Sequence, residues 1–217
     1  MYHYIEDKAF LKKMKAHCAD IINQLVQTIN SDSVMTVEAH LVGSGARNLI
    51  TQNANDPIDL DYNLCVVECF EINPNNGREL KEYIRKQFNL ILNRNGWNDC
   101  QDSTSALSTG RRYFKKGNQT EFSIDLAIIR ENHRGWERLI HNKTGWIAYD
   151  QWYWNEAPKS RGLAEKVEDI KEENLWLEVR RLYLEKKNFY LRRGDNNHPS
   201  FNVYIETINE IFYKYFR

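Results

Sequence analysis

The stretch that decides the fold is IDLDYNL, residues 58–64, in which apolar and polar side chains alternate. This alternation predicts a β-strand, because successive side chains of a strand point to opposite faces of the sheet. Leu60 and Tyr62 then share one face, while Asp59 and Asp61 share the other. Two carboxylates side by side on an apolar strand repel each other, and a divalent cation is the usual group that offsets such repulsion. The segment therefore predicts a packed sheet with a cation site on its open face.

A second stretch, FSIDLAI at residues 122–128, repeats this pattern. Its apolar residues form one face of a predicted strand, and Asp125 projects from the other face. If the two strands are neighbours, the carboxylates of Asp59, Asp61 and Asp125 converge on one side of the sheet. Carboxylate oxygens are the ligands that Mg²⁺ and Mn²⁺ prefer, with further positions taken by water and phosphate. We therefore expect these three aspartates to be the metal ligands.

A glycine-containing turn, Gly43-Ser44-Gly45, follows a strand expected over residues 36–42. A glycine between a strand and a helix lets the backbone approach a ligand closely, and the helix that follows offers free N–H groups to phosphate. Ser44 can donate a hydrogen bond to a phosphate oxygen, and Arg47 adds a charged contact one turn later. These residue types predict a site for the phosphates of a nucleotide.

In this order and spacing, the three motifs resemble those of the DNA-polymerase-β-like nucleotidyltransferase superfamily over residues 36–129. The resemblance implies that Asp59 and Asp61 hold two Mg²⁺ ions, that Asp125 completes the ligands of the catalytic ion, and that the Gly43-Ser44 turn holds the phosphates. It also implies an activity: an acceptor hydroxyl attacks the α-phosphate of an NTP and releases pyrophosphate, with Mg²⁺ or Mn²⁺ as cofactor.

The remaining sequence suggests an α+β (α/β) protein with a mixed-sheet nucleotidyltransferase core, flanking helices and a C-terminal helical module. We expect the catalytic core over residues 1–130 and a mainly helical module over residues 131–217, packed on the core. The expected helices are 6–29, 46–52, 79–93, 162–193 and 199–216, and the expected strands are 36–42, 58–67, 104–115 and 120–129. The aromatic run at residues 149–154 fits a base-stacking platform or, as the more frequent case, packed core.

Composition excludes several classes of protein. Lys+Arg and Asp+Glu both total 30 in the 217 residues, so the net charge does not indicate nucleic-acid binding. A net charge of zero still allows a local basic patch on the surface. The sequence contains no secretory signal and no apolar stretch of membrane-spanning length. Its four cysteines follow no disulfide or zinc spacing. We expect a cytoplasmic protein without a membrane partner, and the oligomeric state stays open.

The resemblance leaves the acceptor open among a nucleotide, an RNA 3′ end, a small-molecule hydroxyl and a protein side chain. The chain is short for a cyclic-dinucleotide synthase and has no evident RNA-binding annex, which favours a small-molecule or protein acceptor. A different class of function is a catalytically silent nucleotide-binding or interaction module of the same fold. Retention of all three carboxylates argues against such a module, because clustered charge on an apolar sheet destabilises the fold.

Overall fold

The computed structural model describes residues 1–157, 162–195 and 199–216. These residues form two compact units. The sheet unit comprises residues 6–48 and 57–157, and the helical unit comprises residues 1–5, residues 49–56 and the described residues from 162 onward. Each unit is built from separate parts of the chain.

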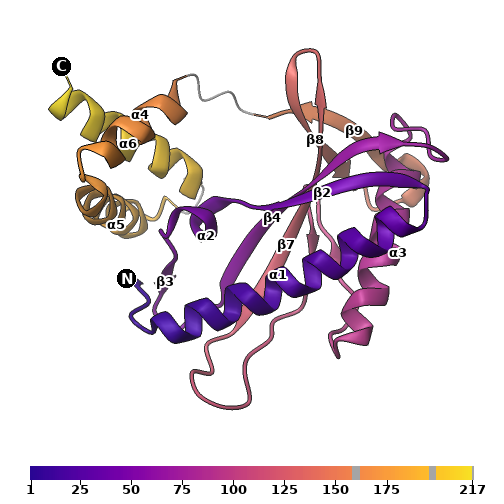
Figure 1. Cartoon of the computed structure of the whole chain (residues 1–217), viewed down its shortest axis with the longest axis horizontal. Helices are drawn as coiled ribbons and strands as arrows, with labels where there is room; N and C mark the ends of the chain where they lie inside the picture. The colour runs from indigo at the N-terminus through magenta and orange to yellow at the C-terminus, as the bar shows by residue number, and fades with distance from the viewer. Residues whose placement is uncertain (158–161, 196–198, 217) are drawn as a thin grey trace. The chain divides into compact units, whose positions relative to one another are not determined.

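A seven-stranded mixed sheet forms the centre of the sheet unit (Figure 1). Strand β4 pairs in parallel with β7 and antiparallel with β2, while β7 also pairs antiparallel with β6 and β8. Strand β5 extends the sheet beyond β6, and β9 extends it beyond β8. The strands are β2 Met35–Leu41, β4 Ile58–Cys69, β5 Gln101–Asp102, β6 Leu107–Ser108, β7 Phe122–Asn132, β8 Gly135–Asn142 and β9 Gln151–Glu156.

Two long helices, α1 (Lys8–Ser31) and α3 (Gly77–Arg94), pack on one face of this sheet (Figure 1). Each begins at a side-chain cap: Asp7 accepts a hydrogen bond from the backbone N–H of Phe10, and Asn76 accepts one from that of Glu79. Their apolar stripes meet the apolar faces of β4 and β7, where Leu60, Tyr62, Leu64, Phe122, Ile124 and Leu126 are buried. Because the helices cover only this face, the alternate residues of both strands lie on the open face.

The mixed α+β fold and the principal strands expected from the sequence are confirmed. The short helix expected at residues 46–52 is wrong: helix α2 spans Gly43–Arg47 and includes the Gly-Ser-Gly turn itself. It ends there because Asn48 adopts a left-handed conformation with φ of 56°, which cannot continue a right-handed helix. Residues 51 and 52, also expected to be helical, belong instead to the strand Thr51–Asn53.

The strand expected at residues 104–115 is much shorter in the structure. Only Leu107–Ser108 forms β6, and a single further bridge joins Arg112 to Phe122. The regular ladder stops at Thr109, because its side-chain Oγ1 accepts the N–H of Ile124 at 2.9 Å in place of a backbone carbonyl. Strand β6 pairs antiparallel with β7, the strand that contains Asp125.

Beyond residue 130 the chain continues the sheet through β8 and β9. The 3₁₀ turn η1 (Ile147–Tyr149) lies between these two strands. Alternate side chains of β9 pack against neighbouring segments. Trp152 lies against Gly77 of α3, and the indole of Trp154 donates a hydrogen bond to the carbonyl of Pro74. These two tryptophans therefore serve as packing residues. Within the described part of the chain, β9 ends at Glu156 and the C-terminal helices begin at Leu163.

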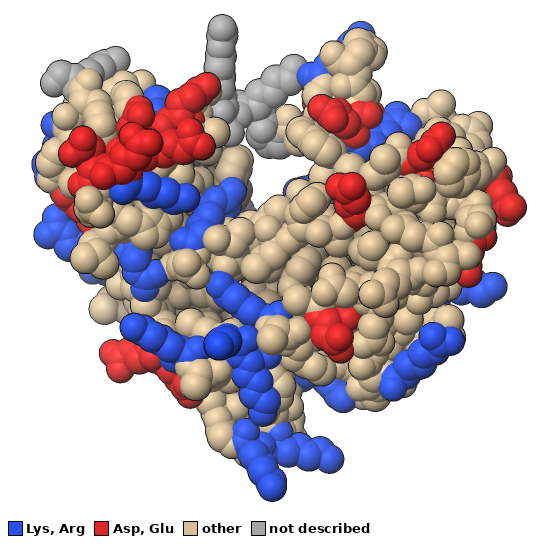
Figure 2. Space-filling view, in the orientation of Figure 1, with Lys and Arg blue, Asp and Glu red and all other residues tan. Residues whose placement is uncertain are grey.

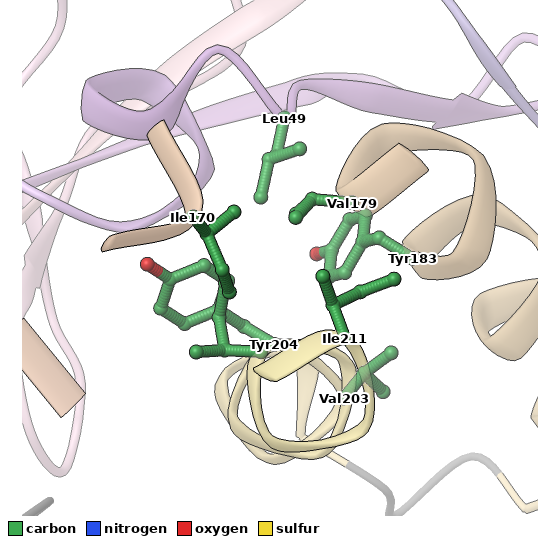
Figure 3. Packing of buried hydrophobic residues seen from close by; sticks show 8 residues of the cluster. Leu49, Ile170, Val179, Tyr183, Val203, Tyr204 and Ile211 are labelled. Atoms are coloured by element: carbon green, nitrogen blue, oxygen red, sulfur yellow. The ribbon is translucent and has the colours of Figure 1, made fainter. Parts of the chain in front are cut away.

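The helical unit contains the short antiparallel pair β1 (Tyr2–Tyr4) and β3 (Thr51–Asn53), with helices α4 (Leu163–Glu172), α5 (Trp176–Arg192) and α6 (Ser200–Tyr215). Figure 3 shows its core, in which Leu49, Ile170 and Tyr183 meet side chains of α6. The single helix expected over 162–193 is broken by a Schellman motif: Asn174 has φ of 58°, and the N–H of Leu175 bonds the carbonyl of Ile170 at 3.0 Å. Among the helices of the described residues, none has the length and apolar character to cross a bilayer.

Candidate active site

The register of β4 and β7 brings the three expected aspartates together. Asp61 lies directly opposite Asp125, and Asp59 lies opposite Ser123. Since residues in register on adjacent strands share a face, the three carboxylates stand on the open face of the sheet, away from α1 and α3. Their burial fits this placement: Leu60 and Ile124 are fully buried, whereas Asp61 and Asp125 are half-buried and Asp59 is exposed.

The carboxylates interact electrostatically in the way that the sequence predicts. Burial, together with the charges of Asp125 and Asp59, raises the pKa of Asp61 to about 6. Burial and the charge of Asp59 also raise the pKa of Asp125, against a hydrogen bond from Ser108 that lowers it. Arg138 on β8 and Arg47 in α2 act on Asp61 in the opposite direction. At Asp61, burial and the neighbouring carboxylates therefore outweigh the nearby arginines.

The Gly43 turn lies directly beside Asp61. The backbone N–H of Val42 donates to the carbonyl of Asp61 at 2.8 Å. Gly43 has φ of +62°, and a Cβ at this position would overlap the Asp61 carboxylate. The close approach that we expected of this glycine is thus made to the aspartate strand.

Helix α2 is held in this position by a residue that the sequence did not single out. The ammonium of Lys15, on α1, donates to the carbonyl of Gly45 at 2.6 Å and to Asn48 Oδ1 at 3.2 Å. Burial lowers the pKa of this lysine. Its contacts satisfy a carbonyl in the last turn of α2, where a cation is favourable. Ser44 and Arg47, the other expected phosphate contacts, are half-buried beside Gly43.

The carboxylates of the open face are the groups that could hold a divalent cation. Among the described residues, no group of three or more His, Cys, Asp or Glu side chains is arranged so that it could by itself hold a metal ion. Mg²⁺ typically takes only one or two protein carboxylates and fills its shell with water and substrate phosphate, so an open set of carboxylates suits it. Three carboxylates on one sheet face, two of them with raised pKa values, suit such a cation in their chemistry.

Two serines belong to this site and were missed by the sequence analysis. Ser123 Oγ donates to Asp59 Oδ1, and Ser108 donates to the carboxylate of Asp125. Ser123 could have been found, because it lies two residues before Asp125 and so on the same face of the predicted strand. Ser108 carries no such signal, since only the pairing of β6 with β7 places it opposite Asp125.

The basic residues of the β6–β7 loop lie at a surface. Figure 2 shows Lys and Arg side chains gathered toward the lower part of the face drawn, around the N-terminal half of α1 and this loop. Arg111 approaches Glu121 at 3.8 Å, and Lys115 and Lys116 are exposed. Exposure and this ion pair are typical of a solvated loop.

Solved structures resemble this chain, whereas no protein-family model and no curated sequence matches it. Escherichia coli CdnC, solved with ATP, superposes with a TM-score of 0.58 at 10% identity, over 94% of this chain and 61% of that chain. The CdnE cyclic dinucleotide synthase of Elizabethkingia meningoseptica, solved with GTP and Apcpp, superposes with a TM-score of 0.51 at 12% identity, over 88% of this chain and 68% of that chain. The chain shares the fold of CdnC and CdnE.

A further solved structure that matches part of this chain is that of the cyclic AMP-GMP synthase DncV of Vibrio cholerae. It matches with a TM-score of 0.46 at 12% identity, over 70% of this chain and 39% of that chain. The chain thus spans about two fifths of DncV and about three fifths of CdnC. Within the fold that the chain shares with CdnC and CdnE, its own aspartates occupy the open face of β4 and β7.

Proposed function

We propose that this chain is a metal-dependent nucleotidyltransferase that transfers an NMP from an NTP to an acceptor hydroxyl and releases pyrophosphate. The observation that carries this proposal is the register of β4 and β7, which sets Asp61 opposite Asp125 on an open sheet face beside the Gly43 turn. The likeness in fold to CdnC and CdnE supports it.

In this proposal Asp59, Asp61 and Asp125 hold Mg²⁺ or Mn²⁺, and Gly43, Ser44 and Arg47 bind the triphosphate. The cation, when bound, neutralises charge on the triphosphate and makes the acceptor hydroxyl more acidic. The acceptor oxygen forms a bond to the α-phosphorus as the bond to the β-phosphate oxygen breaks, and pyrophosphate leaves with that electron pair. Asp125, with a raised pKa, is suited to receive the proton of the acceptor hydroxyl.

We propose a hydroxyl of a second nucleotide as the acceptor, and this acceptor should be tested first. CdnC was solved with ATP, and CdnE, a cyclic dinucleotide synthase, with GTP and Apcpp. These ligands support a purine NTP as donor and a second nucleotide as acceptor, in place of the small-molecule or protein hydroxyl that the chain length favoured.

The test is incubation of the full chain with each α-labelled NTP, alone and in pairs, with Mg²⁺, followed by measurement of pyrophosphate and separation of labelled products. We expect Asp59→Asn, Asp61→Asn and Asp125→Asn each to abolish pyrophosphate release while the chain stays folded. Glu68→Gln is the matched control, because Glu68 is an exposed carboxylate on the same strand β4. Full activity of an aspartate variant would disprove the assignment.

The alternative of a catalytically silent nucleotide-binding module predicts a different result from the same assay. A silent module would bind NTP and release no pyrophosphate with any acceptor offered. The unfavourable electrostatics of the site disfavour a silent module, because carboxylates whose pKa values are raised by burial and by one another lower stability without a bound cation.

A further inference from the structure

Two of the three aspartates are tied to serines of the neighbouring strands, and the third is not. We propose that Ser108 and Ser123 are positioning residues, which hold the carboxylates of Asp125 and Asp59 in the orientation that receives the cation and leave Asp61 to move onto it. This inference rests on the proposed function and deepens it, because it assigns the residues that prepare the same site.

Ser123 is positioned by the sheet itself. It lies on β7 in register with Asp59 on β4, and its residue is 7% exposed, so its hydroxyl has little access to solvent. Its Oγ donates to Asp59 Oδ1. One oxygen of that carboxylate is therefore engaged by a group on a rigid strand. The other oxygen remains available, and its direction is set by the first.

Ser108 performs the same role for Asp125 from the opposite side of β7. It lies in register with Asp125 and donates to its carboxylate. The next residue fixes its backbone: Thr109 donates its N–H to the carbonyl of Ile124 at 2.9 Å and accepts the N–H of Ile124 at Oγ1, also at 2.9 Å. With two hydrogen bonds to one residue of β7, the backbone next to Ser108 has little freedom to shift.

Strands β5 and β6 form a hairpin, and a buried ionic network holds its β5 strand. Asp102, on β5 and paired with Leu107, contacts the ammonium of Lys81 at 2.6 Å and His141 Nδ1 at 2.7 Å. His141 Nε2 in turn contacts Asp150 at 2.9 Å. The side chains of Lys81 and His141 are 3% and 7% exposed, so these contacts are shielded from water. Ser108 therefore belongs to a strand pair anchored at both ends.

Asp61 contrasts with its two neighbours. In the part of the chain that the structure describes, no side chain donates a hydrogen bond to its carboxylate, which is flanked by Gly43 instead. Hydrogen bonds from outer groups orient metal ligands, and their loss typically weakens metal affinity about 10–100-fold. The arrangement thus provides two oriented carboxylates and one adjustable carboxylate for the same cation.

The test measures Mn²⁺ binding to the full chain by the loss of the free-ion EPR signal, with a nonhydrolysable ATP analogue present. We expect Ser108→Ala and Ser123→Ala each to weaken apparent Mn²⁺ affinity about 10-fold or more. Ser108→Thr, which keeps the hydroxyl, should bind Mn²⁺ close to wild type. Ser103→Ala is the matched control, because the hydroxyl of Ser103 lies in the same hairpin and bonds the carbonyl of Ala106.

Thermal unfolding in EDTA separates positioning from folding. A positioning role predicts a nearly unchanged Tm without metal and a smaller rise of Tm on adding Mn²⁺ with the analogue. Should either alanine variant fold poorly, the Ser→Cys variant removes the strong donor at nearly constant size and should show the same loss. Wild-type Mn²⁺ affinity in variants that lack the hydroxyl would overturn this inference alone. A wild-type chain that binds no Mn²⁺ with the analogue would overturn both this inference and the proposed function.

Discussion

At the scale of single residues, Asp61 bears the largest electrostatic cost of the site. It lies between Asp59 on its own strand and Asp125 on the next, and its pKa is raised to about 6 by burial first and these charges second. A carboxyl group with a pKa higher in the folded than in the unfolded chain favours folding when it is protonated. Its contribution to stability is present below the unfolded value of 3.8 and is lost as the pH rises through about 6.

Asp61→Asn should therefore stabilise the metal-free chain at neutral pH while abolishing nucleotidyl transfer. We expect a gain of about 1–3 kcal/mol in the free energy of unfolding at pH 8, shrinking as the pH falls toward 4. Urea unfolding in EDTA at several pH values measures this difference. A variant with the same pH dependence as wild type would show that Asp61 ionises freely in the fold.

Gly43→Ala should destabilise the chain through two separate causes. The residue has φ of +62°, and the added methyl would meet the Asp61 carboxylate. The backbone strain alone costs about 1 kcal/mol, and displacement of the carboxylate adds to it. Gly117→Ala isolates the strain, because Gly117 has φ of +85° with nothing near its Cβ position. Urea unfolding should show a larger loss for Gly43→Ala, and only this variant should lose transfer; equal losses would remove the steric part of the explanation.

At the scale of elements, the β5–β6 hairpin depends on charges more than on its length. Its two strands have two residues each, and Asp102 ties them to α3 through Lys81 and to β8 through His141. Buried ion pairs add little over an apolar replacement of both partners, but removal of one partner leaves the other charge unpaired. The hairpin is therefore sensitive to single substitutions within this network.

Lys81→Met should destabilise the chain by about 3–5 kcal/mol, because it leaves Asp102 without the ammonium at 2.6 Å. Lys86→Met is the control, since Lys86 is exposed on the same helix α3 and should change stability by less than about 0.5 kcal/mol. Chemical unfolding of both variants gives the comparison. If the two variants lose similar stability, the network contributes nothing specific to the hairpin.

The elements differ in how well the sequence predicts them. Strand β4 and helices α1 and α3 carry long periodic patterns, so their type and approximate bounds follow from the sequence alone. Helix α2 was misplaced because its end is set by the left-handed backbone of Asn48, and asparagine only sometimes adopts that conformation. Strand β6 was overextended because a side-chain acceptor, Thr109 Oγ1, replaces the backbone acceptor that would continue the ladder.

At the scale of the whole molecule, the helical unit is assembled from distant parts of the sequence. Its strands β1 and β3 come from the N-terminal quarter of the chain, and its helices begin at Leu163. Asn188 on α5 bonds both the N–H and the carbonyl of Tyr2, at 2.7 and 2.9 Å. Side chains of all three helices and Leu49 share one core (Figure 3). We infer that β1 and β3 depend on the helices for their order.

Ile170→Ala should destabilise this unit by about 2–5 kcal/mol, because the side chain is fully buried in its core. Hydrogen exchange should increase in β1 and β3 as well as in α4, α5 and α6. Leu177→Ala is the control: Leu177 is 79% exposed on α5, and its loss should leave exchange unchanged. Faster exchange in the helices with unchanged protection of β1 would show that the strands do not need this core.

The sequence by itself determined the alternation that places Asp59 and Asp61 on one face and Asp125 on a matching strand, because strand periodicity is a local property of the backbone. The sequence also determined the turn at Gly43, because glycine adopts a positive φ more readily than other residues. Only the tertiary structure decided that β4 and β7 are parallel neighbours with Asp61 opposite Asp125. It alone placed Ser108 on the Asp125 carboxylate and brought Tyr2 to Asn188. Strand pairing and core packing join residues far apart in the chain, and no local pattern encodes which partner each will meet.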